Sequence, residues 1–193
     1  NSLTTEKDHI GIAFCDSKLR LIGYAKKLDQ LSKKHISNQL NSDLSFQSRE
    51  SKIFDYATVH NPNNCKLSKL YIFKLRDFTS FSIRDFQILG GHLASLISFY
   101  QEDRVGIYPD GIVSKKISFV NGISEMLIGS LLATYKFNKY KSKETKSNKI
   151  QKFSKVKIYS SNFSRLEKNF VNVNAIAEGV TMTRNLVTEP PNF

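Results

Sequence analysis

The sequence predicts an α/β fold in which helices flank both faces of a mixed β-sheet and a long helix ends the chain. Three observations lead to this prediction. Short apolar runs of strand length recur along the 193 residues, two of them are separated by a strong turn, and strands then alternate with segments of helical periodicity. The turn implies an antiparallel pair and the alternation implies crossover connections, so the sheet is expected to be mixed.

The first third of the chain is expected to contain one buried strand followed by helical structure. His9–Cys15 is a short apolar run that includes a glycine, as is typical of a strand buried on both faces. Apolar residues then recur at helical spacing from Leu19 to Leu40, and either two helices or one kinked helix satisfies this pattern. The Asn-Ser-Asp run at 41–43 supplies the turn chemistry that ends this region.

A β-hairpin and an amphipathic helix are expected next. Residues 51–59 and 69–75 have strand character, and the Asn-Pro-Asn-Asn run between them predicts an antiparallel connection. Residues 82–100 then place their apolar side chains on one helical face, with Thr79 or Ser80 as the expected cap.

Strands and helices alternate through the rest of the chain. Residues 104–108 and 156–159 are expected strands, and residues 117–135 between them have helical periodicity. A last helix begins near residues 161–162 and must end before Pro190, because proline lacks the backbone N–H and clashes with the preceding turn. The apolar runs and stripes predict a core that includes Ile12, Phe14, Ile72, Phe73, Leu93, Leu127 and Ile158.

The last helix carries an apolar stripe whose members recur every three or four residues. The chain runs from this helix into Pro-Pro and stops at Phe193. A long helix that ends in this way is expected to be a connector whose downstream domain is missing. The stripe consists of Leu166, Phe170, Val173, Ile176, Ala177, Val180, Thr183 and Val187.

Two motifs in the last third of the chain carry a family resemblance. Residues 177–192, AEGVTMTRNLVTEPPN, resemble the run A-x-G-x-x-x-x-R-[DN]-L-x-x-x-P-P-N that joins the two domains of the leucyl aminopeptidases, the cytosol aminopeptidase family. Residues 135–141, YKFNKYK, are similar to that family's aromatic and basic segment Y-x-F-[DN]-x-Y-K. The order of the expected strands and helices also agrees with the amino-terminal domain of the family.

The resemblance implies a macro-domain-like α/β domain at residues 1–160, and at 161–193 a long connector helix with the start of an absent catalytic domain. It implies that the parent protein is a cytoplasmic, metal-dependent leucyl aminopeptidase that assembles as a hexamer. The parent would release N-terminal amino acids from peptides by hydrolysis with two divalent ions, Mn²⁺ or Zn²⁺. The amino-terminal domain would serve assembly and substrate access.

The 193-residue chain by itself is expected to be inactive. The family's metal-binding and catalytic motifs, of the type V-G-K-G and N-T-D-A-E-G-R, are absent from these residues. No catalytic, cofactor-binding or metal-binding residue is therefore assigned, and Arg184 and Asn192 of the junction motif are expected to have structural roles. The histidines lack the spacing of a metal pair: His9, His35, His60 and His92.

Gly90-Gly91 and Glu102-Asp103 are two smaller candidate sites. Gly90-Gly91 could approach a phosphate, as glycine-rich loops of macro domains do, but they fall inside a helical pattern, which favours close packing of a helix on the sheet. Glu102-Asp103 is a tight acidic pair, but adjacent side chains on an extended segment point apart. A macro-like nucleotide-binding domain stays an alternative function.

The chain is strongly basic, with a net charge of +12 and a pI near 9.7. Between residues 136 and 157, lysines are interleaved with aromatic side chains, a composition that can track a phosphate backbone and stack bases. A solvated loop explains the same pattern, so weak or no nucleic-acid binding is expected, with a nucleic-acid-binding module as the alternative. The lysines are Lys136, Lys139, Lys141, Lys143, Lys146, Lys149, Lys152, Lys155 and Lys157.

The cysteine content and the hydropathy pattern bear on the compartment. Cys15 and Cys65 are too few and too far apart for a disulfide framework, which favours a reducing, cytoplasmic environment. No apolar run reaches the length of about eighteen residues that a membrane-spanning helix requires, so no membrane partner is expected.

Overall fold

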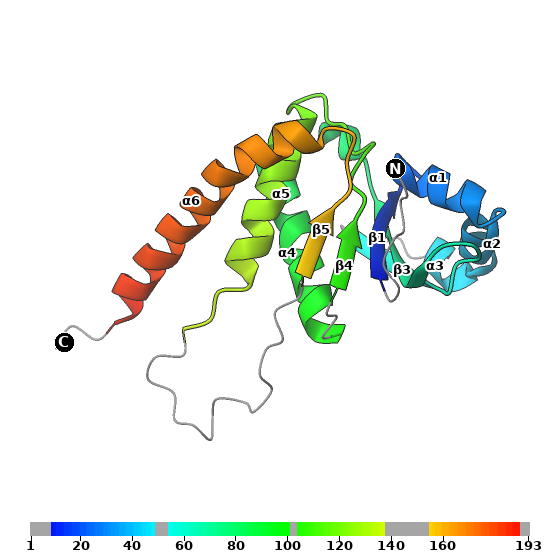
Figure 1. The fold of residues 1–193 in the computed structure, drawn as a ribbon, viewed down its shortest axis with the longest axis horizontal. Coiled ribbons are helices and arrows are strands. Elements are labelled where there is room, and N and C mark those ends of the chain that lie inside the picture. The colour runs from blue at the N-terminus through cyan, green and yellow to red at the C-terminus, as the bar shows by residue number, and fades with distance from the viewer. Residues whose placement is uncertain (1–8, 49–53, 101–103, 138–154, 190–193) are drawn as a thin grey trace, which may run out of the picture.

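A five-stranded mixed β-sheet lies at the centre of the protein (Figure 1). The structure, a computed structural model, describes residues 9–48, 54–100, 104–137 and 155–189. In these residues the strand order is β2-β3-β1-β4-β5, with β2 and β3 antiparallel and the other neighbouring pairs parallel. The strands are β1 (His9–Cys15), β2 (Phe54–His60), β3 (Leu67–Leu75), β4 (Arg104–Ile107) and β5 (Lys155–Ile158).

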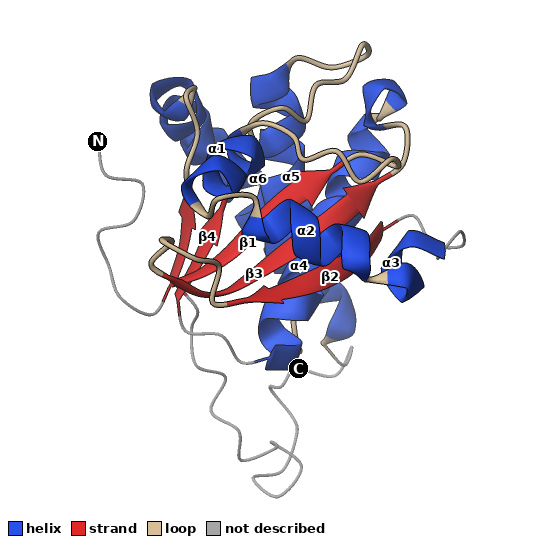
Figure 2. Cartoon of the chain, turned by 90° about the vertical axis from the view of Figure 1, so that its right-hand side faces the viewer, coloured by secondary structure: helices blue, strands red, loops and turns tan. Residues whose placement is uncertain are grey.

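Helices cover both faces of this sheet, as Figure 2 shows. The predicted α/β fold, with a mixed sheet between helices and a long helix at the end, is therefore confirmed. One face carries α1 (Tyr24–Leu31), α2 (His35–Ser42) and α3 (Leu44–Ser48). The other face carries α4 (Ile83–Tyr100), α5 (Phe119–Ala133) and α6 (Phe163–Thr188).

β1 is the central strand and has the predicted bounds. Ile12 pairs with Tyr71 of β3 on one side and with Ile107 of β4 on the other. Because both faces of the sheet are covered, successive side chains of β1 are buried whichever way they point. Ile12, Ala13 and Phe14 are fully buried in consequence.

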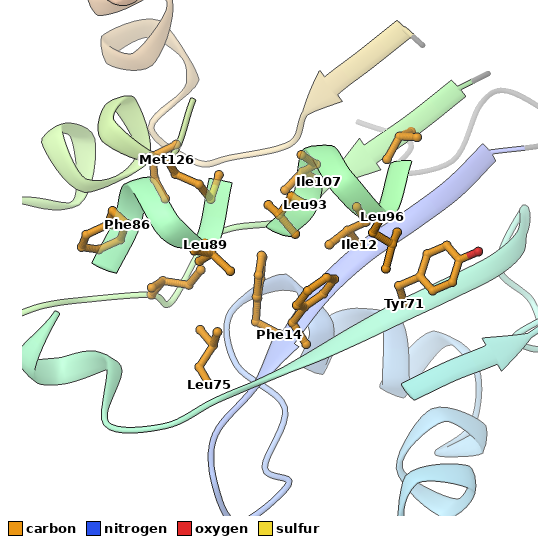
Figure 3. Close-up of a cluster of buried hydrophobic side chains, with 14 of the residues drawn as sticks. Ile12, Phe14, Tyr71, Leu75, Phe86, Leu89, Leu93, Leu96, Ile107 and Met126 are labelled. Carbon is orange, nitrogen blue, oxygen red and sulfur yellow. The ribbon is translucent and has the colours of Figure 1, made fainter. Parts of the chain in front are cut away.

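The sheet separates two hydrophobic clusters. Figure 3 shows the first, in which Phe14 of β1 packs with Leu93 of α4 and Ile107 of β4. The second cluster lies on the opposite face, where Ala13 and Ile72 pack against apolar side chains of α1 and α2. Neighbouring strand residues point to opposite faces, so the short apolar run of β1 contributes to both clusters at once.

Two members of the predicted core are corrected by the structure. Leu127 and Ile158 are half-buried, whereas the other five predicted residues are buried. α5 lies between α4 and α6, so it buries two of its faces, and a single apolar stripe does not describe it. Ile123 and Met126 are the α5 side chains that enter the core.

α4 and α5 approach each other closely through glycines. A Cβ added at Gly90 would collide with the Met126 carbonyl oxygen, and a Cβ at Gly129 would collide with the Gln87 carbonyl oxygen. The Ser130 hydroxyl donates a hydrogen bond of 2.9 Å to the carbonyl oxygen of Gly90. The close packing predicted for Gly90 is confirmed, although its partner is another helix and not the sheet.

The helical region after β1 begins later than its apolar spacing suggested. Leu19 has a positive φ of 60° and lies in a turn whose backbone N–H groups donate to the Asp16 carboxylate. α1 begins only at Tyr24. Lys33 and Lys34 also have positive φ values, of 54° and 62°, so the region forms separate helices and not one kinked helix.

The cap of α4 differs from the predicted one. The backbone N–H and the hydroxyl of Ser82 both donate to Asp85 Oδ2, at 2.8 and 2.7 Å. These hydrogen bonds lower the pKa of the Asp85 carboxyl. Thr79 and Ser80 lie instead in a short 3₁₀ turn, so they do not cap the helix.

Candidate functional site

The long helix α6 is the element that the sequence singled out. It contains 26 residues, packs along α5 and extends away from the sheet (Figure 1). Leu166, Val173 and Ala177 are its buried side chains, and Asn169 Nδ2 donates to Ser124 Oγ of α5 at 2.8 Å. The first half of α6 is therefore docked on the domain by both apolar and polar contacts.

The second half of α6 is attached to the end of α5 through three polar contacts. Arg184 Nη1 donates to the Leu132 carbonyl oxygen at 3.2 Å, and the guanidinium carbon lies 5.6 Å from the centroid of the Tyr135 ring. The Tyr135 hydroxyl donates to Asn185 Oδ1 at 2.8 Å. The two sequence motifs thus meet in space, a contact that no spacing in the sequence indicated.

Much of the predicted apolar stripe of α6 faces solvent in the described part of the chain. Ile176 is 50% exposed and Val187 is 81% exposed, and the neighbouring Met182 and Leu186 are 65% and 64% exposed. Gly179 has no atom within 4 Å of the position that a Cβ would occupy. The second half of the helix therefore presents an apolar surface that nothing in the described residues covers.

α6 stops where the proline rule predicted. Thr188 is its last residue, and Glu189 is extended, with φ of −72° and ψ of 138°. The residues 190–193, which include Asn192 of the junction motif, lie outside the described part of the chain. The predicted stop before Pro190 is confirmed.

No constellation suited to metal chemistry is found in the described residues. The four histidines lie on separate elements, at β1, α2, β2 and α4. Across the described ranges, no three His, Cys, Asp or Glu side chains come together in a way that could hold a metal ion. These residues therefore do not fit a two-metal centre. None of the helices in the described ranges is both long and apolar enough to cross a bilayer.

The remaining sequence candidates lie partly outside the described residues. Residues 138–154, which hold most of the lysine-rich stretch, and the pair Glu102-Asp103 belong to the ranges that are not described. Weak or absent nucleic-acid binding therefore stays a prediction. Gly90-Gly91 lie inside α4 and not at a helix amino terminus, so they offer no ready phosphate cradle.

Neither cysteine has the surroundings of a reactive thiol. Cys15 is fully buried at the end of β1, and this burial, together with the Asp16 carboxylate, raises the pKa of the Cys15 thiol to about 12. Cys65 is half-buried, and burial raises its pKa as well. A thiol nucleophile needs a lowered pKa, so both side chains are structural.

Comparison with known proteins places the chain in a family. Residues 12–144 match the sequence profile described as "Cytosol aminopeptidase family, N-terminal domain". The chain is 30% identical over 132 residues to the probable cytosol aminopeptidase of Rhizobium etli, covering 68% of this chain and 26% of that protein. It is 28% identical over 186 residues to the cytosol aminopeptidase of Rickettsia prowazekii, covering 94% of this chain and 36% of the relative.

Solved structures agree on the fold. A mutant of tomato leucine aminopeptidase superposes with a TM-score of 0.63 at 14% identity, covering 100% of this chain and 37% of the tomato chain. The bottromycin maturation enzyme BotP in complex with Mn superposes with a TM-score of 0.58 at 10% identity, covering 96% of this chain and 32% of that enzyme. The chain thus spans about a quarter to a third of the length of these proteins. The profile match covers well over half of the chain, which therefore belongs to the cytosol aminopeptidase family and contains that family's N-terminal domain.

Proposed function

We propose that this chain is the noncatalytic amino-terminal part of a metal-dependent leucyl aminopeptidase that works in the cytoplasm. Residues 1–160 form the N-terminal domain, and residues 161–193 form the connector and the start of the catalytic domain. Two divalent ions in that catalytic domain, Mn²⁺ or Zn²⁺, supply the Lewis acid and the activated water for hydrolysis of peptides. No step of the reaction is assigned to a residue of this chain.

The observation that carries the proposal is the uncovered apolar surface of α6. Met182, Leu186 and Val187 are each more than half exposed, on a helix whose first half is packed on the domain. Contiguous apolar surface of this kind marks an interface. This chain covers only 36% of the Rickettsia relative, and the profile that it matches is that of an N-terminal domain. A following domain is therefore the proposed partner of this surface.

A glycine in the same half of the helix supports this interpretation. Gly179 lies inside α6 with open space around it, although glycine costs roughly 1 kcal/mol relative to alanine in a helix interior. No described residue comes close enough to Gly179 to offset this cost. A backbone that approaches α6 closely at Gly179 would explain the residue, and the catalytic domain is the proposed source of that backbone.

The N-terminal domain has a positioning role in this proposal. The Arg184 and Tyr135 contacts hold the second half of α6 at a defined angle to the sheet. A domain that packs on α6 is then held in a fixed orientation, which supports assembly into a hexamer and the access of peptides to the catalytic domain. Peptide substrates, the hexamer and the cytoplasmic compartment are parts of this proposal.

The proposed docking surface is tested with paired variants. Met182→Ser and Leu186→Ser together should leave the thermal stability of the 193-residue chain nearly unchanged, because both side chains are exposed. In the protein extended by its natural coding sequence after Phe193, the same pair should lower stability and metal-dependent leucine release. Phe99→Ser is the matched control, because Phe99 is 79% exposed on α4, away from α6. Equal effects of the pair and of the control on the extended protein would contradict the proposal.

A further inference from the structure

Strand β5 lies at the edge of the sheet, where β4 is its one neighbouring strand among the described residues. In the parallel pair with β4, the Tyr159 N–H donates to the Ile107 carbonyl oxygen at 2.9 Å. Along a strand, every second residue directs its N–H and C=O groups to the same neighbouring strand. Because Tyr159 faces β4, the N–H and C=O groups of Val156 and Ile158 point away from β4. Within the described ranges, no strand pairs with this outer edge.

A groove of about 840 Å³ runs beside this edge. It is bounded by α1 on one side of the sheet and by α5 and α6 on the other, so it surrounds the outward-facing backbone of β5. Val156, Phe163 and Phe170 are 43%, 53% and 46% exposed, which leaves apolar side chains in contact with water along it. The groove is lined by Tyr24, Lys27, Leu127, Ile158, Phe163 and Phe170, among others.

The two walls of the groove differ in chemistry. Ile158 packs against the cluster on the α4 side, so alternation directs Val156 to that side and Lys155 to the side of α1. Lys157 points to the side of α1 for the same reason. The α1 wall is basic, because Lys157 and Lys27 both line the groove there, with Lys27 Nζ 4.6 Å from the centroid of the Tyr24 ring. The α5–α6 wall is apolar, with a carboxylate at its rim from Glu167.

A second copy of the chain does not suit this edge. In the two antiparallel registers that pair most of one β5 with another, Lys157 lies opposite either its own copy or Lys155. Like charges directly opposite each other destabilise a strand pair. Each chain also carries a net charge of +12. Charge complementarity instead favours an acidic partner.

We propose that the outer edge of β5 binds an extended peptide segment with alternating acidic and apolar side chains, which adds to the sheet as a further strand. The peptide backbone bonds to the outward groups of Val156 and Ile158. Its acidic side chains face Lys27 and Lys157, and its apolar side chains face Leu127 and the phenylalanines of α6. This inference does not depend on the function proposed above.

The test measures binding of a fluorescein-labelled peptide, EVELEVEL, to the full 193-residue chain by fluorescence anisotropy. Val156→Pro removes the outward N–H, and edge strands tolerate proline, while Val156→Thr keeps the N–H as the matched control. Because a lost hydrogen bond is worth about 1 kcal/mol, Val156→Pro should weaken binding roughly three- to tenfold and Val156→Thr less than about twofold. Circular dichroism melts establish that both variants are folded.

Peptide variants keep the test decisive if Val156→Pro does not fold. Two further peptides are N-methylated, one at the glutamates and the other at the apolar residues, so that each loses the N–H groups of one strand edge. Exactly one edge faces β5, so one of these peptides should bind as the parent does and the other should lose most binding. The peptide KVKLKVKL, which reverses the charges, should bind more weakly, and Lys27→Glu with Lys157→Glu should reverse that preference.

Three results would overturn the proposal. Equal binding of both N-methylated peptides would show that no strand is added. Equal or tighter binding of KVKLKVKL would show that charge does not select the partner. A dimer of the unliganded chain in sedimentation experiments, abolished by Val156→Pro, would assign the edge to a second copy.

Discussion

The Tyr135 hydroxyl donates a hydrogen bond of 2.8 Å to Oδ1 of Asn185, 50 residues further along the chain. Tyr135 follows the end of α5, and Asn185 lies in the last turn of α6. The Arg184 guanidinium lies against the same ring, with its carbon 5.6 Å from the ring centroid. These contacts fix where the second half of α6 lies, beyond the region in which its apolar side chains are buried.

Removing this hydroxyl should loosen only the end of α6. Tyr135→Phe keeps the ring beside Arg184 but removes the donor to Asn185. The free energy of local opening in the second half of α6 should fall by about 0.5–1 kcal/mol, as expected for one exposed hydrogen bond. Amide hydrogen exchange with mass spectrometry measures this. Tyr100→Phe removes a hydroxyl from α4 and should leave exchange in α6 unchanged; similar exchange in both variants would contradict the prediction.

Two helix glycines should respond to alanine in opposite directions. Gly179→Ala should stabilise the 193-residue chain by about 0.5–1 kcal/mol, because the position is open and alanine favours helix. Gly90→Ala should destabilise it by roughly 1–3 kcal/mol or more, because the new Cβ meets the Met126 carbonyl oxygen of α5. Urea unfolding measures both. Destabilisation by Gly179→Ala would mean that another part of the chain packs there.

Truncation to alanine at two neighbouring residues of α5 should lower the free energy of unfolding by different amounts. Met126 is fully buried between α4 and the sheet, so Met126→Ala should cost about 2–5 kcal/mol. Leu127 is half-buried and lines the groove beside β5, so Leu127→Ala should cost less than about 2 kcal/mol. Thermal and urea unfolding of the two variants give the comparison. A larger loss at Leu127 would place it in the core after all.

The strands and the later helices could be predicted from the sequence more closely than the first helical region. β1 stands at the predicted residues His9–Cys15, because a strand covered on both faces leaves a continuous apolar run. The predicted hairpin is found as β2 and β3, because a strong turn connects two segments of strand character. Leu19 fits a helical spacing but belongs to a turn that the Asp16 carboxylate stabilises. The spacing of apolar residues does not reveal such hydrogen bonds between a side chain and the backbone.

The candidate site, too, could be predicted from the sequence only where local chemistry decides the structure. The junction motif located α6 and its stop before Pro190, since both depend on local chemistry. The contact of Tyr135 with Asn185 depends on the angle between α5 and α6. Packing between the two helices sets this angle, and no local sequence pattern predicts it. The exposure of Ile176 and Val187 could not be predicted either, because an apolar stripe has the same appearance in sequence whether or not its partner is present.

The buried thiol of Cys15 should make stability depend on alkaline pH. Burial, aided by the Asp16 carboxylate, raises the pKa of Cys15 from the usual 9.0 to about 12. Above pH 9 the unfolded chain loses a proton that the folded chain keeps, so the free energy of unfolding should fall between about pH 9 and pH 12. Urea unfolding across this range should show a steeper fall for the natural chain than for Cys15→Ala. Equal slopes would contradict the burial of this thiol.

We predict that the chain supplies a domain and a connector but not the chemistry of an aminopeptidase. The most direct measurement is release of 4-nitroaniline from leucine 4-nitroanilide with added Mn²⁺ or Zn²⁺. It compares the purified 193-residue chain with the protein extended by its natural coding sequence after Phe193. We predict no metal-dependent activity for the chain alone and activity for the extended protein, because the described residues form no group that could hold a metal. Metal-dependent release by the purified 193-residue chain would contradict the account.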